Sequence, residues 1–225
     1  MTGDGSAEGH LERARQLYEQ GVFDGDEAAL AIADRELDAV EAALALARGR
    51  NIHTKFLTAR DRDPAQAVED PAELPLFERS RALYQSLGDT AGEADALFWL
   101  GCFHQVVRGD DGTAVPLLER SLALATQAGA TSTMSEDLRH LGIAAQRAGH
   151  LDQARTHLEE SNRLRREAGF LPGVASNLIG LAYIAAAQNR PADGRTHLDE
   201  ATTLATTANA HRILHHITEA RTHLQ

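Results

Sequence analysis

The chain has 225 residues, of which 43% are hydrophobic and 24% are charged, and its formal net charge is −11. Such an acidic chain repels phosphate groups, so we expect no nucleic-acid partner. No apolar run is long enough to cross a bilayer, so we expect no membrane partner either. The single cysteine, Cys102, excludes an intramolecular disulfide, and the polar start lacks a signal-peptide pattern. Together these features predict a cytoplasmic protein.

Residues 1–60 are predicted to form N-terminal helices that diverge from the rest of the chain. The apolar spacing predicts a helix pair over 6–21 and 26–49 and a further helix over 51–60. The next segment, 61–71, is acidic, contains two prolines and lacks helical periodicity. We therefore expect a loop there that is sensitive to proteases.

An internal repeat occupies residues 72–209. Three segments align without gaps at a period of forty residues, and a fourth aligns one residue out of step; they are 114–129, 154–169, 194–209 and 73–88. Each has apolar residues three and four apart, which is typical of an amphipathic helix. Each also ends at Gly or Asn, the residues that tolerate the left-handed backbone at a helix C-terminus.

A second helix precedes each of the last three segments. It carries two leucines three residues apart and then a small residue that lets a neighbouring helix approach closely, at 97–101, 138–142 and 178–182. Short connections rich in Gly, Asn or Pro are predicted at 109–112, 149–150 and 189–191. Such helix pairs bury their apolar faces only by stacking. The sequence therefore predicts an all-α solenoid of stacked antiparallel helix pairs, with residues 210–225 as a truncated unit that serves as a capping helix.

The pattern Leu-x-x-Leu-Gly at 138–142, followed by Ala154 and Leu158 in the next helix, resembles the tetratricopeptide repeat (TPR). The forty-residue units resemble the longer repeats in the helical regions of large bacterial transcriptional regulators. The resemblance covers about residues 72–209 and implies a right-handed α-solenoid of about five helix pairs. It also implies that the first helix of each pair lines a concave binding groove, at Asp95, Phe98, Cys102, Gln105, Glu136, Arg139, Ile143, Gln146, Ser176, Ile179 and Tyr183.

We expect this groove to bind another molecule. Phe98, Ile143, Ile179 and Tyr183 offer apolar anchors, and Arg139 could hold a carboxylate in a bidentate pair. The favoured function is therefore a protein- or peptide-binding scaffold or adaptor, and the acidic charge favours a basic or amphipathic partner. Alternatively, these apolar side chains contact the chain's own C-terminal helices. The exposed ends of a solenoid also leave open a homodimer, formed through the N-terminal helices or through the truncated C-terminal unit.

The local motifs of common enzymes are missing. The sequence has no Gly-x-x-x-x-Gly-Lys phosphate loop, no Gly-x-Ser-x-Gly elbow, no Cys-x-x-Cys and no His-Glu-x-x-His. We therefore expect no catalytic residues and no cofactor. Two alternatives to the scaffold stay open. One is a small-molecule sensor or carrier that acts with a partner in trans, and the other is an enzyme whose groove uses His104, Arg139 and Tyr183 as acid–base or anion-holding groups.

Two further side-chain patterns lead to structural predictions. His104 is either a hydrogen-bonded core histidine or a pocket histidine that binds or titrates. Cys102 precedes it by two residues, which is about 200° around a helix, so the two side chains cannot pair. The run of Arg163, Arg165 and Arg166 alternates with glutamates and is predicted to be a solvated helix face.

The last histidines of the chain raise the question of a metal. His211, His215 and Glu219 are spaced four apart and share one helical face, and such ligands could take zinc or nickel. A surface capping helix with its imidazoles in water explains the same spacing. We therefore expect no metal site.

Overall fold

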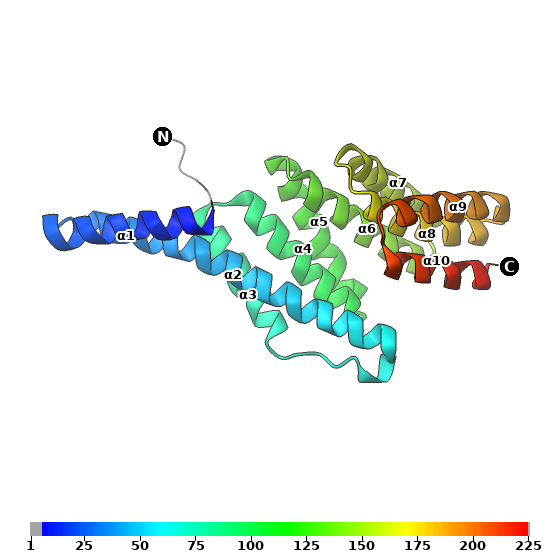
Figure 1. Ribbon diagram of the computed structural model, residues 1–225, viewed down its shortest axis with the longest axis horizontal. Coiled ribbons are helices and arrows are strands. Elements are labelled where there is room, and N and C mark those ends of the chain that lie inside the picture. Colours follow the sequence, from blue (N-terminus) through cyan, green and yellow to red (C-terminus); the bar gives the residue numbers. More distant parts are fainter. Residues whose placement is uncertain (1–5, 225) are drawn as a thin grey trace. The chain divides into compact units, whose positions relative to one another are not determined.

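The computed structural model describes residues 6–224 and is all-helical. Ten α-helices and one short 3₁₀ helix, with no strand, occupy this range, and helices account for 86% of the residues. The prediction of an all-α, solenoid-like chain of packed helix pairs is confirmed (Figure 1). The chain forms two compact units, one up to Leu117 and one from Leu118 onward, and the boundary along the chain falls within a single helix.

The first unit is a succession of helices. Its elements are α1 (Ala7–Asp24), α2 (Glu27–Arg62), the 3₁₀ helix η1 (Pro64–Gln66), α3 (Glu73–Leu87), α4 (Thr90–Val106) and the beginning of α5 (Asp111–Ala128). Helix α1 packs against α2, α2 against α3, and α3 against α4. Side chains of Ser6, Asp26 and Asp89 accept hydrogen bonds from backbone N–H groups at the starts of α1, α2 and α4. These caps fix where the helices begin.

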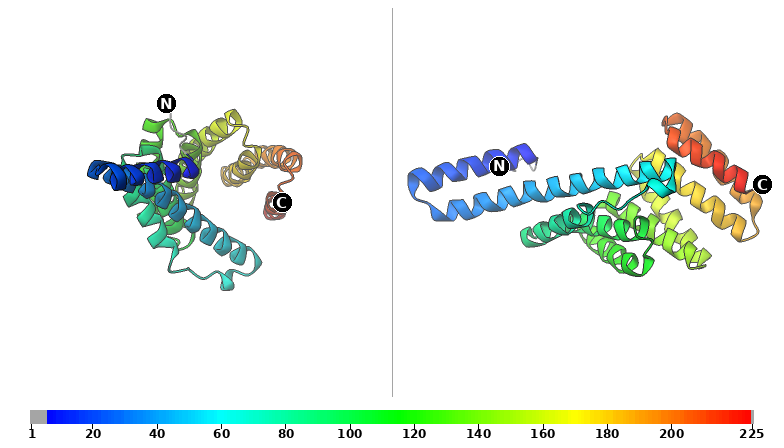
Figure 2. Two further views of the ribbon diagram at one scale, coloured as in Figure 1. Left: turned by 60° about the vertical axis from the view of Figure 1, so that its left-hand side comes forward. Right: turned by 90° about the horizontal axis from the view of Figure 1, so that it is seen from below.

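Helix α2 differs from the prediction of two separate helices over 26–49 and 51–60. It is one helix of 36 residues that runs through Gly49, Arg50 and Asn51 without a break. Gly49 is not a helix end here; it is a point at which α2 packs closely against α3, where a Cβ atom would lie 2.4 Å from Cε1 of Phe77. The first half of α2 lies beside α1 and the second half continues beyond it (Figure 2).

The acidic segment predicted as a loop over 61–71 is shorter in the structure, because α2 extends to Arg62 and residues 64–66 form η1. Hydrogen bonds and one ion pair hold part of the remaining connection. Asp63 caps the 3₁₀ turn, and the Arg108 guanidinium pairs with Glu69 at 2.7 Å. The N–H group of Ala72 donates to the Asp70 carboxylate. The expected protease sensitivity of this segment stays a prediction.

The second unit continues the alternation of helices. It contains the rest of α5 and then α6 (Thr131–Arg147), α7 (Leu151–Glu167), α8 (Leu171–Ala187), α9 (Pro191–Thr207) and α10 (His211–His223). From α6 on, each helix packs against the next, and α6 also touches α8, as α8 touches α10. The turns are closed by left-handed residues, as the sequence predicted, at Gly129, Gly149, Gly169, Asn189 and Asn209.

A hydrogen bond recurs between successive repeats of the second unit. The Ser121 hydroxyl donates to Asp137 Oδ2 at 2.8 Å, sixteen residues later. Forty residues further along the chain, the Asn177 amide donates to the Ser161 hydroxyl at 2.8 Å, across the same spacing. The equivalent positions in the next repeat are Ala201 and Ile217, which are both buried in the apolar core. The sequence repeat therefore reproduces the helix packing, while the chemistry at the equivalent positions varies.

Candidate functional site

All seven groove residues predicted in the second unit lie on one partly exposed face. The helical period places them on α6 and α8, away from the buried residues that pack against α7 and α9. We call this set the α6–α8 face; it consists of Glu136, Arg139, Ile143 and Gln146 on α6 and Ser176, Ile179 and Tyr183 on α8.

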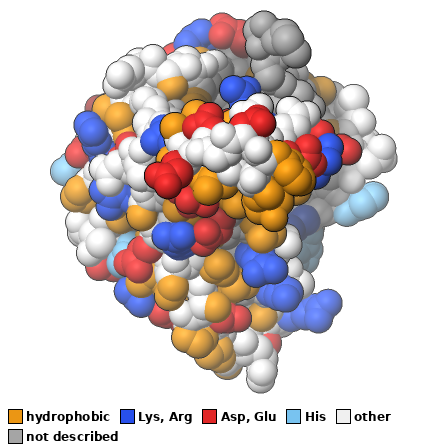
Figure 3. Space-filling model, turned by 90° about the vertical axis from the view of Figure 1, so that its left-hand side faces the viewer, with side chains coloured by type: hydrophobic (Ala, Val, Ile, Leu, Met, Phe, Trp, Pro, Cys, Tyr) orange, Lys and Arg blue, Asp and Glu red, His pale blue; other side chains and the backbone are white. Residues whose placement is uncertain are grey.

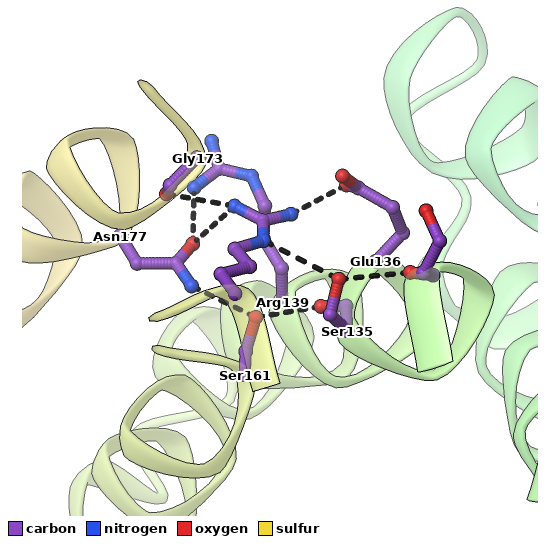
Figure 4. Close-up of polar contacts among 8 residues, drawn as sticks. Ser135, Glu136, Arg139, Ser161, Gly173 and Asn177 are labelled. Atoms are coloured by element: carbon purple, nitrogen blue, oxygen red, sulfur yellow. Dashed lines mark hydrogen bonds and ion pairs between the residues drawn. The ribbon is translucent and has the colours of Figure 1, made fainter. Parts of the chain in front are cut away.

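A cluster of hydrogen-bonded polar side chains connects the first turns of α6 and α8 (Figure 4). Arg139 Nη1 donates to the Asn177 side-chain oxygen at 2.8 Å, so the two helices are joined directly. The Asn177 amide donates to the Ser161 hydroxyl on α7, and that hydroxyl donates to the backbone carbonyl of Ser135 at 2.6 Å. The polar positions of the face are thus held in place by buried partners.

Arg165 lies at the centre of this cluster, and the prediction that it belongs to a solvated face is wrong. Its side chain is 2% exposed, whereas Arg163 and Arg166 on either side are exposed. Its guanidinium donates to the Gly173 carbonyl at 2.8 Å and pairs with Glu136 at 2.7 Å. Burial lowers the pKa of Arg165, and the nearby Glu136 carboxylate opposes that shift.

The internal repeat contained a signal for Arg165. At a period of forty residues it aligns with Ala125 and Ala205, and both of these alanines are fully buried. A position that is buried in two repeats is expected to be buried in the third. The contacts with Glu136 and Asn177 come from other helices, so no local pattern in α7 points to them.

The α6–α8 face combines apolar anchors with one partly exposed guanidinium group. This group, on Arg139, donates to Asn177, while the Glu136 carboxylate pairs with the buried Arg165. Further along the face Ile179 and Tyr183 are partly buried against the core of the second unit. Burial raises the pKa of Tyr183, and the charge of Glu219 adds to the shift, so its hydroxyl stays protonated and able to donate. Such a surface can take both an apolar side chain and a hydrogen-bond acceptor.

The groove positions predicted in the first unit are different, because three of the four are buried. Phe98 and Cys102 are 4% exposed and Gln105 is 1% exposed. Asp95 is partly exposed but forms an ion pair with Arg50 of α2. In the described structure this part of α4 therefore packs inside its own unit and offers little surface to a partner.

The partner of Cys102 is a histidine that sequence reasoning missed. Cys102 Sγ lies 3.6 Å from Nε2 of His53, and Nδ1 of His53 lies 2.7 Å from Glu73 Oε1. The order thiol, imidazole, carboxylate is that of an activated nucleophile. However, none of the three residues is more than 4% exposed, so a substrate cannot reach the sulfur in this structure. The contact joins α2, α3 and α4, and its residues are too far apart in sequence to be paired from the sequence alone.

His104 lies on the other side of α4 from Cys102 and is only partly buried. Its ring stands edge-on to Phe103, with ring centroids 5.4 Å apart, and its Nδ1 atom is buried without a hydrogen-bond partner. Burial lowers the pKa of His104, and the charge of Arg108 adds to the shift. The side chain is therefore neutral near pH 7, as both sequence alternatives allow.

The three residues considered for a metal do not form a site in the structure. His215 Nε2 lies 3.4 Å from Glu219 Oε1, and both side chains are largely exposed, as is His211. Within residues 6–224, no group of three His, Cys, Asp or Glu side chains converges as metal ligands would. These residues line the exposed face of α10.

A hollow of about 290 Å³ opens beside α9 and α10. One wall carries Arg221, whose guanidinium donates to Asp199 at 2.6 Å. The volume is near the lower end for small-molecule sites. Its lining is mainly apolar with two arginines, and consists of Ala186, Pro191, Gly194, Arg195, Leu198, Arg221 and Leu224.

No protein-family model and no curated protein matches this sequence. Over the part of the chain that is described, no helix has the length and apolar character required to cross a membrane.

Proposed function

We propose that this chain is a TPR-like scaffold, without catalytic activity, that binds a peptide or protein segment along the α6–α8 face. The observation that carries the proposal is that all seven predicted positions of this face are partly exposed side by side, whereas the equivalent positions of α4 are mostly buried. A cytoplasmic location belongs to the same proposal, and the one cysteine, buried and unbridged, is in keeping with it.

The chemistry of the face suggests what such a segment would contain. Ile143, Ile179 and Tyr183 supply apolar contact area, and aromatic residues at such positions often contribute most of the binding energy. Arg139 is fixed by Asn177, so less conformational entropy is lost when it binds an acceptor. A peptide with an apolar side chain followed by a carboxylate or carbonyl would meet both features.

The test is affinity capture from lysate by the full chain, with quantitative mass spectrometry, followed by titration of the captured partner with purified protein. The Ile179→Ala/Tyr183→Ala variant is expected to bind the partner at least about tenfold more weakly than the unchanged chain does. The reason is that two apolar side chains, each contributing about 1–2 kcal/mol of binding free energy, are removed. Both residues pack partly on the core, so circular dichroism and thermal unfolding must show that this variant is folded.

The matched control is His197→Ala, which truncates a partly exposed side chain on α9, outside the face. This variant is expected to bind like the unchanged chain. If a partner binds the folded Ile179→Ala/Tyr183→Ala variant as tightly as the unchanged chain, the α6–α8 face is not its binding site and the proposal fails.

A small-molecule sensor is the second candidate, and the hollow beside α9 and α10 is the observation that favours it. Its apolar lining with Arg195 and Arg221 at the wall suits a small molecule with an apolar body and an acidic group. Native mass spectrometry of the full chain would reveal such a ligand as a mass increment, and Arg195→Gln is expected to lower its occupancy. An increment that is unchanged by Arg195→Gln would place the ligand elsewhere.

A further inference from the structure

Large apolar side chains are exposed mainly on the hairpin of α1 and α2. Of the ten exposed large hydrophobic residues in the described chain, eight belong to these two helices. Helix α1 has 18 residues and buries only Ala14. A contiguous apolar surface of this kind on a folded protein marks an interaction site. This surface belongs to the first unit and shares no residue with the α6–α8 face.

Six of the eight residues form two rows that run along the hairpin. Leu11 and Tyr18 on α1 are seven residues apart, with Val22 one turn further, and a seven-residue spacing also relates the three leucines of α2. Seven residues are two helical turns, so each row keeps to one side of its helix. We call these six residues the hairpin stripe: Leu11, Tyr18, Val22, Leu30, Leu37 and Leu44, each between 40% and 58% exposed.

Contacts between the helices show that the two rows lie on the same side of the hairpin. Gly21 of α1 faces Leu30, since a Cβ atom there would lie 2.5 Å from that side chain. His10 and Arg13 both reach Glu36, which fixes the antiparallel register. With these residues turned inward, the helical period turns both rows toward the same side. Figure 3, which looks at the end of the hairpin, shows hydrophobic side chains gathered beside acidic ones.

The hairpin stripe is bordered by carboxylates on both edges. On α1, Glu12 and Glu19 are seven residues apart, and on α2 a second row has the same spacing at Glu27, Asp34 and Glu41. Only two guanidinium groups in the described residues form ion pairs with these five carboxylates. Arg15 pairs with Glu12 and Glu19, and Arg79 pairs with Glu41. The border is therefore acidic on balance, and it occupies the positions that flank the apolar seam in a coiled coil.

We propose that the hairpin stripe binds one amphipathic helix of a partner protein, with aliphatic residues along its apolar face and Lys or Arg along both flanks, to form a three-helix bundle. The heptad spacing selects a helix as the occupant, and the acidic border selects its basic flanks. A second copy of this chain would bring like-charged rows of carboxylates together, which opposes self-association at moderate salt.

The test uses three synthetic helical peptides of about three heptads. The first has Leu at the seam positions and Lys at the flanks, the second has Glu in place of Lys, and the third is a scrambled form of the first with the same charge. Binding to the full chain is measured by fluorescence anisotropy at about 0.15 M salt. We expect the first peptide to bind at least about tenfold more tightly than either of the others.

Two variants test where the peptide binds and whether the acidic border causes the preference for Lys. Leu37→Asn/Leu44→Asn changes only exposed side chains, so it is expected to stay folded and to weaken binding of the first peptide about tenfold or more. Glu27→Lys/Asp34→Lys is expected to narrow or reverse the preference between the Lys- and Glu-flanked peptides. Val68→Asn, an exposed apolar residue in the α2–α3 connection, and Ile179→Ala/Tyr183→Ala are the controls and should bind like the unchanged chain.

Three results would overturn this proposal. The first is that the Lys-flanked peptide binds no better than the scrambled peptide, and the second is that the Leu37→Asn/Leu44→Asn variant binds it unchanged. The third is a dimer seen by light scattering at about 0.15 M salt that this same variant dissociates, because the occupant would then be a second copy. Each outcome is independent of what binds the α6–α8 face.

Discussion

Arg165 joins three helices of the second unit through one buried guanidinium. Its partners are Glu136 on α6 and both Gly173 and Asn177 on α8. Without it, Glu136 would lose its ion pair and the Gly173 carbonyl would lose this donor. The Asn177 side-chain oxygen would keep only Arg139 as a donor. An unmatched buried polar group is costly. Arg163, two residues earlier, forms exposed pairs with Glu160 and Glu167. The two arginines therefore allow a direct comparison of a buried and an exposed charge.

We predict that Arg165→Met lowers the free energy of unfolding by about 3 kcal/mol. The matched control Arg163→Met should change it by no more than about 0.5–1 kcal/mol, because exposed ion pairs contribute little. Urea unfolding followed by circular dichroism measures both. Equal effects of the two substitutions would show that the polar cluster does not stabilise the second unit.

A second buried contact, between His53 and Glu73, is tested by a double-mutant cycle. His53→Leu and Glu73→Leu each leave the other group buried without its partner, and each should cost about 2–4 kcal/mol. The double variant removes both groups, so its loss should be smaller than the sum by about 1–3 kcal/mol. Urea unfolding gives the four values. Strict additivity would show that the two side chains do not interact.

His104 predicts how stability depends on pH. Burial, followed by the charge of Arg108, lowers its pKa below the ordinary value of 6.5. The unfolded chain then binds a proton at a higher pH than the folded protein does, so this contribution to stability is complete above about pH 6.5 and is lost as pH falls below it. Unfolding measured between pH 7 and pH 5 should show a smaller loss for His104→Phe than for the unchanged chain. Equal losses would contradict the assignment.

Individual side chains were predictable from the sequence where the repeat determines their surroundings. The partly exposed positions Ile143, Ile179 and Tyr183 follow from their place in α6 and α8, although the same rule fails for Phe98 in α4, which is buried. The environments of Arg165 and Cys102 do not, because they depend on partners from other helices. His53 is 49 residues from Cys102, and no spacing rule relates two residues at that distance.

At the scale of helices, α2 shows how packing decides the role of a glycine. Gly49 is followed by Arg and Asn, a sequence that also suits a helix end, and the prediction ended a helix there. In the structure Phe77 occupies the space of the missing side chain, so the helix continues. The glycines at 129, 149 and 169 were predicted correctly as helix ends because each recurs, as Gly or Asn, at the same place in another repeat.

We predict different effects for two Gly→Ala substitutions. Gly49→Ala should destabilise the protein by about 1–3 kcal/mol, because its Cβ atom would lie 2.4 Å from the Phe77 ring. Gly112→Ala should change the stability by less than about 1 kcal/mol, because the helix propensity of alanine opposes the close approach to Asp110 Oδ1, at 3.3 Å. Thermal unfolding of the two variants checks this difference. A stabilising Gly49→Ala would argue against the close approach of α2 and α3.

For the molecule as a whole, the net charge of −11 causes electrostatic repulsion between two copies of the chain. Like charge keeps the hairpin stripes of two copies apart at low salt, and screening removes most of that repulsion at about 1 M salt. Light scattering is expected to show monomers at about 0.05 M salt and increased self-association at about 1 M. Leu37→Asn/Leu44→Asn should reduce that increase. Association that weakens with added salt would contradict this account.

The continuity of α2 has a consequence for the exchange of backbone protons with water. In its second half, Ala45, Leu46, His53 and Phe56 are buried, while most residues in its first turns, beside α1, are exposed. Amide protons in the first half should therefore exchange through small local openings, and those in the second half only through much larger ones. The amide protons of α2 would then exchange at two different rates. Binding of a partner helix to the hairpin stripe would slow the faster exchange, in the first half of α2.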